Sequence, residues 1–106
     1  MIYIFWTCKN KEEAKEIIFG LLDKRLIACA SILPEIESIY RWQGKIEEGK
    51  EAKIMLKTQA KHFDLICNYI VENGSYQVPE ILQVDVSKGN PRYISWVKDE
   101  TEDLSD

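Results

Sequence analysis

The sequence predicts an α+β fold, a ferredoxin-like βαββαβ order with one additional C-terminal helix. Apolar segments with strand-like and helix-like spacing follow one another along the chain in that order. The two middle strand-like segments meet at a tight turn, Gln43-Gly44. Asn90-Pro91 then begins a last short helix, since Asn suits the N-cap and Pro the first helical position. We expect one domain over residues 1–106, because 45% of the residues are hydrophobic.

The first strand and helix are expected directly after the N-terminus. Residues Ile2 to Cys8 are apolar on both faces, which is typical of a buried central strand. Asn10 is a candidate N-cap, with Glu13 three positions later as in a capping box. The apolar stripe of the helix that follows is Ala14, Ile17, Ile18, Leu21 and Leu22. Gly20 falls inside this helix, and we expect a close contact with the sheet to explain it.

Two long strands, Ala28 to Trp42 and Lys45 to Thr58, are expected to form a hairpin. Pro34 has no N–H to donate to a strand partner, so a bulge or an edge position is expected there. Gly49 is a candidate for a second bulge. A shorter hairpin that folds back at Pro34 and Gly49 is the alternative to two continuous strands.

The second half of the chain adds a helix, a strand and the terminal helix. Residues Ala60 to Asn73 carry a helical stripe, and Gly74 is suited to end the helix. The stripe is Phe63, Ile66, Cys67 and Ile70. The alternating segment Ile81 to Ser87 places Leu82, Val84 and Val86 on one face of a strand. The acidic residues Asp99 to Asp106 are expected to fray.

The predicted hairpin is longer than its own sheet can cover. At about 3.3 Å per residue, the first strand spans about 20 Å and the hairpin roughly twice that. Its outer part would be an isolated two-stranded ribbon that carries Ile39, Tyr40 and Trp42 near the tip. Exposed strand edges and aromatic surface invite another chain. We therefore expect a homo-oligomer in which strands pair between subunits.

Composition excludes several classes of protein. The net charge is −4 and the pI about 5.1, so bulk attraction to nucleic acid or to an anionic membrane is not expected. The apolar run at the N-terminus is too short to span a membrane. Three scattered cysteines without an export signal are typical of a reduced, cytoplasmic protein. No CxxC motif or Cys/His cluster indicates a zinc site.

Several short motifs, in order, resemble the CutA divalent-cation tolerance family. They are LIACA (Leu26 to Ala30), Y-x-W-x-G-K (Tyr40, Trp42, Gly44, Lys45), E-x5-K-T (Glu51, Lys57, Thr58), Y-x-x-P-E (Tyr76, Pro79, Glu80) and Y-x-x-W (Tyr93, Trp96). No single motif is specific, whereas the ordered set, which extends from Thr7 to Val97, is quite specific. The resemblance implies a ferredoxin-like homotrimer similar to PII signalling proteins, in which the long hairpin joins sheets across subunits.

The same resemblance implies a cytosolic role in tolerance of copper or other divalent metals, with no accepted catalytic reaction. One departure concerns the metal. The family usually has His-Pro before the tyrosine of its Y-x-x-P-E motif, and this chain has Gly74-Ser75. The only histidine, His62, matches no family motif. A histidine-based metal site is therefore not expected.

Seven residues are candidates for ligand binding: Tyr40, Trp42, Glu51, Lys57, Tyr76, Glu80 and Trp96. The four aromatic side chains would line a cleft between subunits, as in many ligand pockets, or pack in a subunit interface. Lys57 would meet an anionic ligand, or would form a structural ion pair with Glu51 or Glu80.

The candidate metal ligands are Cys8 and Cys29, because soft Cu(I) favours thiolate. Cys8 ends the first strand and is expected to be the more exposed thiol. Cys29 is either a ligand or a small buried hydrophobic residue. Three symmetry-related thiols would have to approach the axis of a trimer. Cys67 fits the core stripe of the second helix.

The leading hypothesis is a cytoplasmic, non-enzymatic homotrimer that binds a metal or small ligand between subunits and acts in divalent-cation tolerance. One alternative is a PII-like regulator that binds an anionic metabolite or nucleotide through Lys57, Lys45 and Arg41. Another is a structural trimer that binds a protein partner. An enzyme is not expected, because no Ser/His/Asp set, Walker loop or GxGxxG motif is present.

Overall fold

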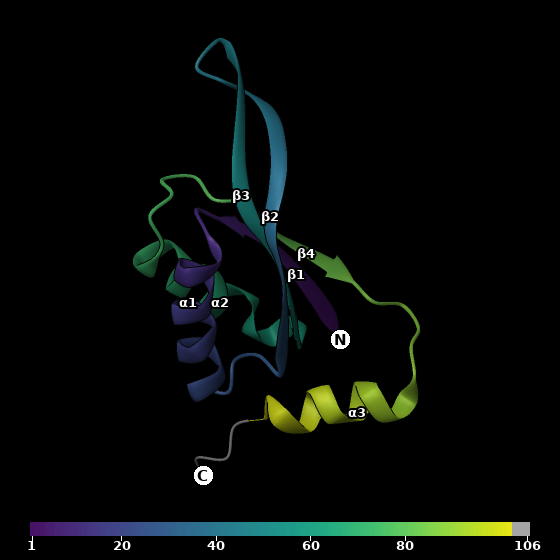
Figure 1. The fold of residues 1–106 in the computed structure, drawn as a ribbon. Helices are drawn as coiled ribbons and strands as arrows, with labels where there is room; N and C mark the ends of the chain where they lie inside the picture. The colour runs from purple at the N-terminus through teal and green to yellow at the C-terminus, as the bar shows by residue number, and fades with distance from the viewer. Residues whose placement is uncertain (103–106) are drawn as a thin grey trace.

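The computed structural model describes residues 1–102 and confirms the predicted fold. Its four strands form one antiparallel sheet in the order β2-β3-β1-β4 (Figure 1). The elements in chain order are β1 (Ile2–Cys8), α1 (Lys11–Asp23), β2 (Cys29–Trp42), β3 (Lys45–Thr58), a 3-10 turn (Ala60–His62), α2 (Phe63–Asn73), β4 (Ile81–Asp85) and α3 (Pro91–Glu100). The segment predicted as one helix from Ala60 is thus a 3-10 turn followed by α2, and β4 ends before Ser87.

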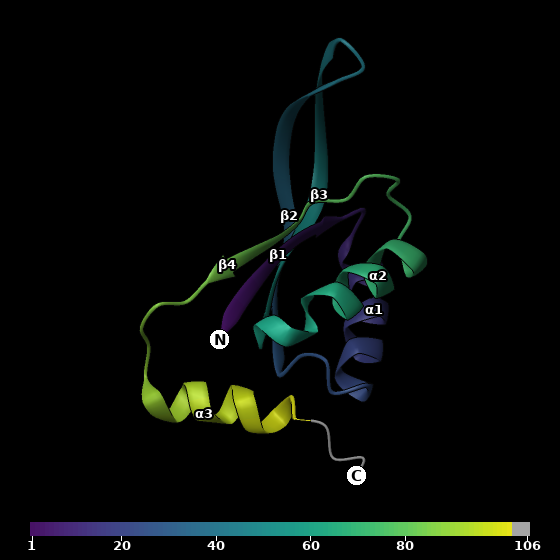
Figure 2. The ribbon, with the colours of Figure 1, turned by 180° about the vertical axis from the view of Figure 1, so that it is seen from behind.

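The hydrophobic core lies between the sheet and the helices α1 and α2, which cover the same face of it (Figure 2). The even-numbered residues of β1 point into this core, and so do alternate residues of β3. The largest fully buried side chains of the two strands are Trp6, Ile4, Ile54 and Leu56. Within residues 1–102, no helix is long and apolar enough to span a membrane.

Helix α1 begins as predicted but meets its neighbours differently. The side chain of Asn10 accepts a hydrogen bond of 2.9 Å from the backbone N–H of Glu13. Gly20 does make a close contact, but with Tyr69 of α2 and not with the sheet: a Cβ at Gly20 would clash with the Tyr69 hydroxyl oxygen. Leu22, which was assigned to the core stripe, is exposed, because the last turn of α1 buries the neighbouring Leu21 instead.

The β2–β3 hairpin is continuous and projects beyond the other strands (Figure 1). Its strands pair from Cys29 opposite Lys57 to Trp42 opposite Lys45. The register shifts once, between Leu33 and Ile36, which confirms the bulge predicted at Pro34. The second predicted bulge is wrong, since Gly49 pairs regularly with Ser38. The fold-back alternative is therefore excluded, and the hairpin gives the molecule a longest dimension of 48 Å.

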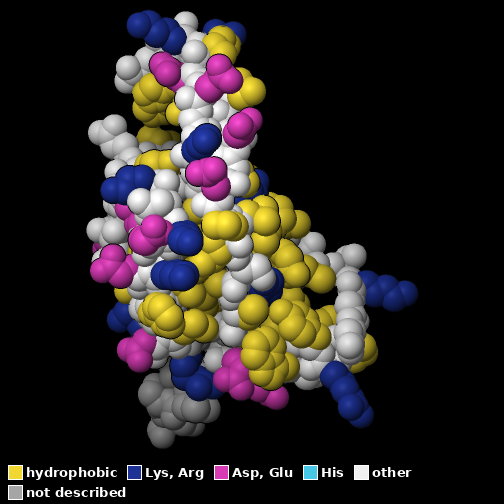
Figure 3. All heavy atoms as spheres, viewed as in Figure 1, with side chains coloured by type: hydrophobic (Ala, Val, Ile, Leu, Met, Phe, Trp, Pro, Cys, Tyr) yellow, Lys and Arg dark blue, Asp and Glu magenta, His cyan; other side chains and the backbone are white. Residues whose placement is uncertain are grey.

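The face of the sheet opposite α1 and α2 has an apolar surface. Tyr3 and Phe5 alternate with the buried residues of β1 and pair with Val84 and Leu82 of β4. Both β4 residues are exposed, as is Leu33 of β2. Figure 3 shows a hydrophobic patch that spreads over this part of the molecule toward α3. We call this surface the open sheet face.

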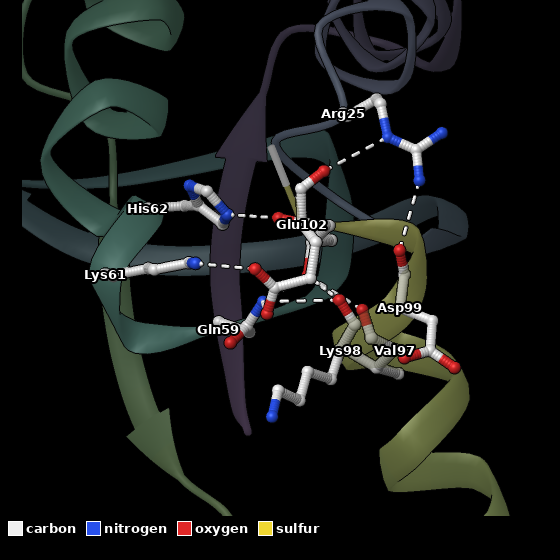
Figure 4. Close-up of polar contacts among 9 residues, drawn as sticks. Arg25, Gln59, Lys61, His62, Val97, Lys98, Asp99 and Glu102 are labelled. Atoms are coloured by element: carbon white, nitrogen blue, oxygen red, sulfur yellow. Dashed lines mark hydrogen bonds and ion pairs between the residues drawn. The ribbon is translucent and has the colours of Figure 1, made fainter. Parts of the chain in front are cut away.

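The C-terminal end of α3 is held to the rest of the chain by polar contacts (Figure 4). The guanidinium of Arg25 donates to the carbonyl oxygen of Asp99 at 3.1 Å and to that of Glu102 at 3.3 Å. The His62 ring lies 2.7 Å from the carbonyl oxygen of Thr101, and Lys61 donates to the Glu102 carboxylate at 3.1 Å. The prediction of fraying is therefore wrong for residues 99–102, while Asp103 to Asp106 lie outside the described residues.

Candidate functional site

A groove of about 630 Å³ runs along the projecting part of the hairpin, beside the loop between α2 and β4. We call it the hairpin groove. Three stretches of chain line it: the end of β1, the hairpin, and residues 75–80. The lining residues are Thr7, Ser38, Ile39, Tyr40, Trp42, Glu51, Ser75, Tyr76, Gln77, Val78 and Glu80. Five of the seven predicted ligand-binding residues are thus brought together within one chain.

Glu51 occupies the polar wall of the groove. The Tyr76 hydroxyl donates to its Oε1 at 3.0 Å, and the Ser38 hydroxyl donates to its Oε2. Both donors are neutral hydroxyl groups. Among residues 1–102 no lysine, arginine or histidine forms an ion pair with this carboxylate. The negative charge of Glu51 is thus hydrogen-bonded but not neutralised by a positive charge.

Tyr76 is fixed as the donor in this pair. Burial raises the pKa of the Tyr76 phenol above its ordinary value, and the hydrogen bond to the Glu51 carboxylate raises it further. The phenol therefore keeps its proton at neutral pH and donates it to Glu51. This bond joins the loop after α2 to strand β3 of the hairpin. It therefore fixes the position of one groove wall and also orients the Glu51 carboxylate.

Glu80 differs from Glu51, because a positive charge lies beside it. Lys53 Nζ lies 3.3 Å from the buried Oε2 of Glu80, without the geometry of a hydrogen bond. Lys53 also lies over the ring of Phe5, 5.4 Å from its centroid. The backbone of Glu80 is fixed to β1, since its carbonyl oxygen accepts a hydrogen bond of 3.2 Å from Thr7 N–H. Glu80 is consequently an ion-paired part of the groove wall.

Part of the groove lining is apolar and accessible. Tyr40 and Trp42 come from β2 and retain 47% and 43% of their surface exposed. Val78 of the loop is 72% exposed, and Ile39 is also exposed. These side chains present apolar surface that a ligand or another chain can cover.

Lys57 lies elsewhere, close to the open sheet face. It is 6% exposed, and its Nζ donates to the Ser31 hydroxyl and lies 3.8 Å from Cys29 Sγ. It also sits 5.6 Å from the centroid of the Tyr3 ring. It forms no ion pair with Glu51 or Glu80, which were its predicted partners. Lys57 is thus a buried cation whose neighbours are neutral.

Trp96 also lies outside the hairpin groove. It is on α3, where its ring centroid is 5.7 Å from that of Tyr93, and it borders a shallow depression formed by α3 residues. Arg41 and Lys45 are exposed near the tip of the hairpin and do not line the groove. Lys45 nevertheless pairs with Trp42 across the hairpin, so Lys57 is the cationic candidate that lies on a different part of the sheet from the groove.

The residues of a single chain do not fit a copper centre. Cys8 was expected to be exposed, but it is 2% exposed because the end of β1 is covered, and its thiol donates to the carbonyl oxygen of Asn10 at 3.2 Å. Burial raises the pKa of the Cys8 thiol to about 11, which disfavours the thiolate that binds metal. Cys29 is partly buried beside Lys57. In the part of the chain that the structure describes, no three His, Cys, Asp or Glu side chains gather to hold a metal ion.

The sequence reasoning missed two residues that complete the groove, Ser38 and Lys53. Ser38 shares the strand parity of Tyr40 and Trp42, so the alternation along the hairpin was a usable signal. Lys53 ends a stretch of mixed charge, Glu47 to Lys53, which carries no sequence signal for a site. Only the pairing of β1 with β3 brings Lys53 beside Phe5 and Glu80.

A profile of the CutA1 divalent ion tolerance protein family matches residues 2–100. Protein CutA of Mus musculus is 42% identical over 101 residues, which cover 95% of this chain and 57% of the mouse protein. The chain thus spans a little over half the length of that relative. The divalent-cation tolerance protein CutA of Pyrococcus horikoshii is 40% identical over 101 residues, covering 95% of this chain and 98% of the relative.

A solved structure shows the same fold. The periplasmic divalent cation tolerance protein CutA from Archaeoglobus fulgidus superimposes with a TM-score of 0.92 at 31% sequence identity. The alignment covers 96% of this chain and 100% of that chain. The match includes the long hairpin, because almost the whole of both chains is aligned.

Proposed function

Because the chain belongs to the CutA1 divalent ion tolerance family, we propose that it is a non-enzymatic, cytoplasmic homotrimer that contributes to tolerance of divalent cations such as copper. It does so by binding a small ligand in the hairpin groove. The observation that carries this proposal is the groove itself. It combines accessible aromatic walls with a half-buried carboxylate, and its volume is that of a small-molecule site.

The shape of the chain supports self-association. The hairpin projects beyond the ends of β1 and β4. Its outer half is therefore a two-stranded ribbon with no neighbouring strand from the same chain. Isolated ribbons are marginal in water, and free strand edges pair readily with other chains. The apolar open sheet face adds a second surface for burial in the same assembly. Three chains related by symmetry would cover both surfaces.

The proposed tolerance role does not use a copper ion held by one chain. The buried Cys8 thiol, the Gly74-Ser75 sequence and the lack of a ligand cluster within residues 1–102 all disfavour such a centre. The ligand-bound trimer would act instead as a sensor, since a ligand that binds the assembled state stabilises it by mass action.

One observation favours a second candidate function, a PII-like regulator of anionic metabolites. Lys57 is a buried ammonium with neutral partners, and burying an unpaired charge is costly. An anion from outside the described chain would offset that cost. The source would be either an anionic ligand or a carboxylate of a neighbouring subunit. Replacement of Lys57 by Met distinguishes the two, because loss of the trimer indicates the subunit carboxylate.

Complementation tests the proposed function directly. A bacterial host that lacks its own CutA-type protein is grown at increasing copper concentrations with the wild-type chain, with a Tyr76→Ala/Glu51→Ala variant, or with a Glu16→Gln control on the exposed face of α1. We expect the wild type and the control to restore growth, and the groove variant not to. Equal growth with and without the wild-type chain would contradict a role in tolerance, and full rescue by the groove variant would contradict the groove.

A further inference from the structure

We propose that Cys29 and Lys57 form a reversible covalent crosslink, a sulfenamide bond between the cysteine sulfur and the lysine nitrogen, when the protein meets a peroxide. The crosslink would be a modification site that does not involve the hairpin groove. Three features support it: the two side chains lie on paired strands, their own chain encloses them, and no second thiol shares their face of the sheet.

Strand pairing places the two reactive groups side by side. Cys29 on β2 is the direct partner of Lys57 on β3, and Lys57 is in turn the partner of Tyr3 on β1. Directly paired residues point to the same face of a sheet, so the three side chains form one row. Lys57 Nζ donates to Cys29 Sγ at 3.8 Å. Only a small movement of the flexible lysine side chain therefore separates the nitrogen from the sulfur.

The row is enclosed largely by its own chain. Lys57 is 6% exposed, and its Nζ also donates to the Ser31 hydroxyl. Tyr93 of α3 lies beside Cys29: burial raises the pKa of the Tyr93 phenol, and the neighbouring Cys29 raises it further. A trimer would cover this row without separating sulfur from nitrogen, because both belong to paired strands of one chain. A peroxide molecule is scarcely larger than water, so it needs no open pocket to reach the sulfur.

The reaction balances with one molecule of hydrogen peroxide. The Cys29 sulfur attacks a peroxide oxygen and the O–O bond breaks, which gives a sulfenic acid and one water. Lys57, after losing a proton to solvent, attacks the sulfur as a neutral amine. The S–O bond breaks, and the departing hydroxide takes a proton from the nitrogen as a second water. The sulfur is thus oxidised by two electrons, the peroxide accepts them, and an uncharged S–N bond remains.

Lys57 is the natural partner for a sulfenic acid at Cys29, because a thiol partner is lacking. Within residues 1–102, which include all three cysteines, no second thiol shares the face of Cys29. Cys8 belongs to the core on the opposite face of the sheet, and Cys67 lies on α2, which covers that opposite face. A sulfenic acid condenses with a thiol or with a nitrogen. Here the nitrogen of Lys57 is already in contact with the sulfur.

Peptide mass spectrometry of the assembled protein, treated with hydrogen peroxide and digested without reductant, tests the crosslink. We expect the wild type and a Cys67→Ser control to give a peptide that joins Cys29 to Lys57 and is about 2 Da lighter than its two parts. Dithiothreitol should reverse the bond. Cys29→Ser should give no such peptide. Lys57→Arg keeps a positive charge, but its guanidinium does not attack sulfur, so oxidation should stop at Cys29 without a crosslink.

Two variants that each remove one reactive atom protect the test against a folding defect in either. Oxidation of the partly buried Cys67 in the wild type is the internal sign that the peroxide has acted. A Cys29 that then stays reduced, or that is oxidised without the joined peptide, would overturn the proposal. So would a disulfide between the Cys29 residues of two subunits, a bridge with an added oxygen, or a crosslink that survives Lys57→Arg. The copper complementation tests the proposed function independently of all these outcomes.

Discussion

The hydroxyl of Tyr76 donates a hydrogen bond of 3.0 Å to Oε1 of Glu51, a residue 25 positions earlier in the chain. Tyr76 belongs to the loop after α2, and Glu51 to strand β3 of the hairpin. The bond therefore joins the two parts of the chain that form the hairpin groove. It also keeps the carboxylate oriented, which the proposed ligand site requires.

Removing this bond should loosen the loop. Tyr76→Phe keeps the ring but leaves Glu51 with one hydroxyl donor, so we expect a loss of about 1–2 kcal/mol in the free energy of unfolding. Urea unfolding at pH 7 measures it. Tyr69→Phe is the matched control, since no hydrogen bond of the Tyr69 hydroxyl is seen among residues 1–102, and it should change stability by less than about 0.5 kcal/mol. Equal losses in the two variants would contradict the assigned role of Tyr76.

Gly20 should resist replacement by alanine, although alanine is favoured in helices by about 1 kcal/mol. A Cβ at this position would clash with the Tyr69 hydroxyl oxygen, so the tyrosine must move. We expect Gly20→Ala to lose this helical gain and to leave the free energy of unfolding within about 0.5 kcal/mol of the wild type, because the Tyr69 ring must be displaced. In a Tyr69→Ala background the same change should become stabilising. A double-mutant cycle by thermal or urea unfolding gives the coupling, and additive effects would show that α1 and α2 do not meet there.

The buried Cys8 thiol should make the fold sensitive to alkaline pH. Burial raises the pKa of Cys8 from an ordinary value of 9.0 to about 11 in the folded state. Between these values the unfolded thiol loses its proton while the folded one keeps it, so stability is full below pH 9 and falls as pH rises. The loss should reach about 2–3 kcal/mol.

Urea midpoints measured between pH 8 and 10.5 test this dependence. Cys8→Ala lacks the titrating group, so its midpoint should fall less steeply over the same range, even though its stability at pH 8 is lower because of the cavity. Lysine and tyrosine titration affects both proteins equally. Parallel curves for the wild type and the variant would contradict the assignment to Cys8.

Arg25 should stabilise α3 through its guanidinium while straining its own backbone. Its φ of 59° lies in the left-handed region, which costs about 1–2 kcal/mol for a residue other than glycine. Arg25→Gly loses the bonds to Asp99 and Glu102 but relieves this strain, whereas Arg25→Ala loses the bonds and keeps it. We expect the order wild type, Arg25→Gly, Arg25→Ala in stability, with the two variants about 1 kcal/mol apart.

Hydrogen exchange of the amides in the last turn of α3 provides the local readout for Arg25. Exchange there should accelerate in both variants, while the amides of β1 change only with global stability. If Arg25→Ala proved as stable as Arg25→Gly, the strain argument would be wrong. Unchanged exchange in α3 would contradict the role of Arg25 in holding the helix end.

The helices and strands of this fold could be predicted from the sequence because each is marked by residues within its own segment. The Asn10 cap, the Asn90-Pro91 start and the bulge at Pro34 follow from the chemistry of single residues, and all three are present. The burial of Cys8 and the contact of Gly20 with Tyr69 depend on which elements pack together. Neither strand periodicity nor helix propensity carries that information.

The candidate site was predictable in part for the same reason. Tyr40 and Trp42 share a strand parity, and their grouping with Glu51 follows from the pairing of the hairpin strands. The separation of Lys57 from the two glutamates was not visible in sequence spacing. Lys57 and Glu51 both lie on β3, but the twisted hairpin carries Glu51 to the groove and leaves Lys57 beside Tyr3 and Ser31.

Native mass spectrometry of the reduced protein, with and without one equivalent of copper per chain, tests the central claim most directly. The claim is that the chain acts as a homotrimer without a copper centre of its own. We expect a mass about three times the 12.4 kDa of one chain, unchanged by added copper. A monomer would contradict the role assigned to the hairpin and the open sheet face. Stoichiometric copper retained by the assembly would contradict the ligand-based account of tolerance.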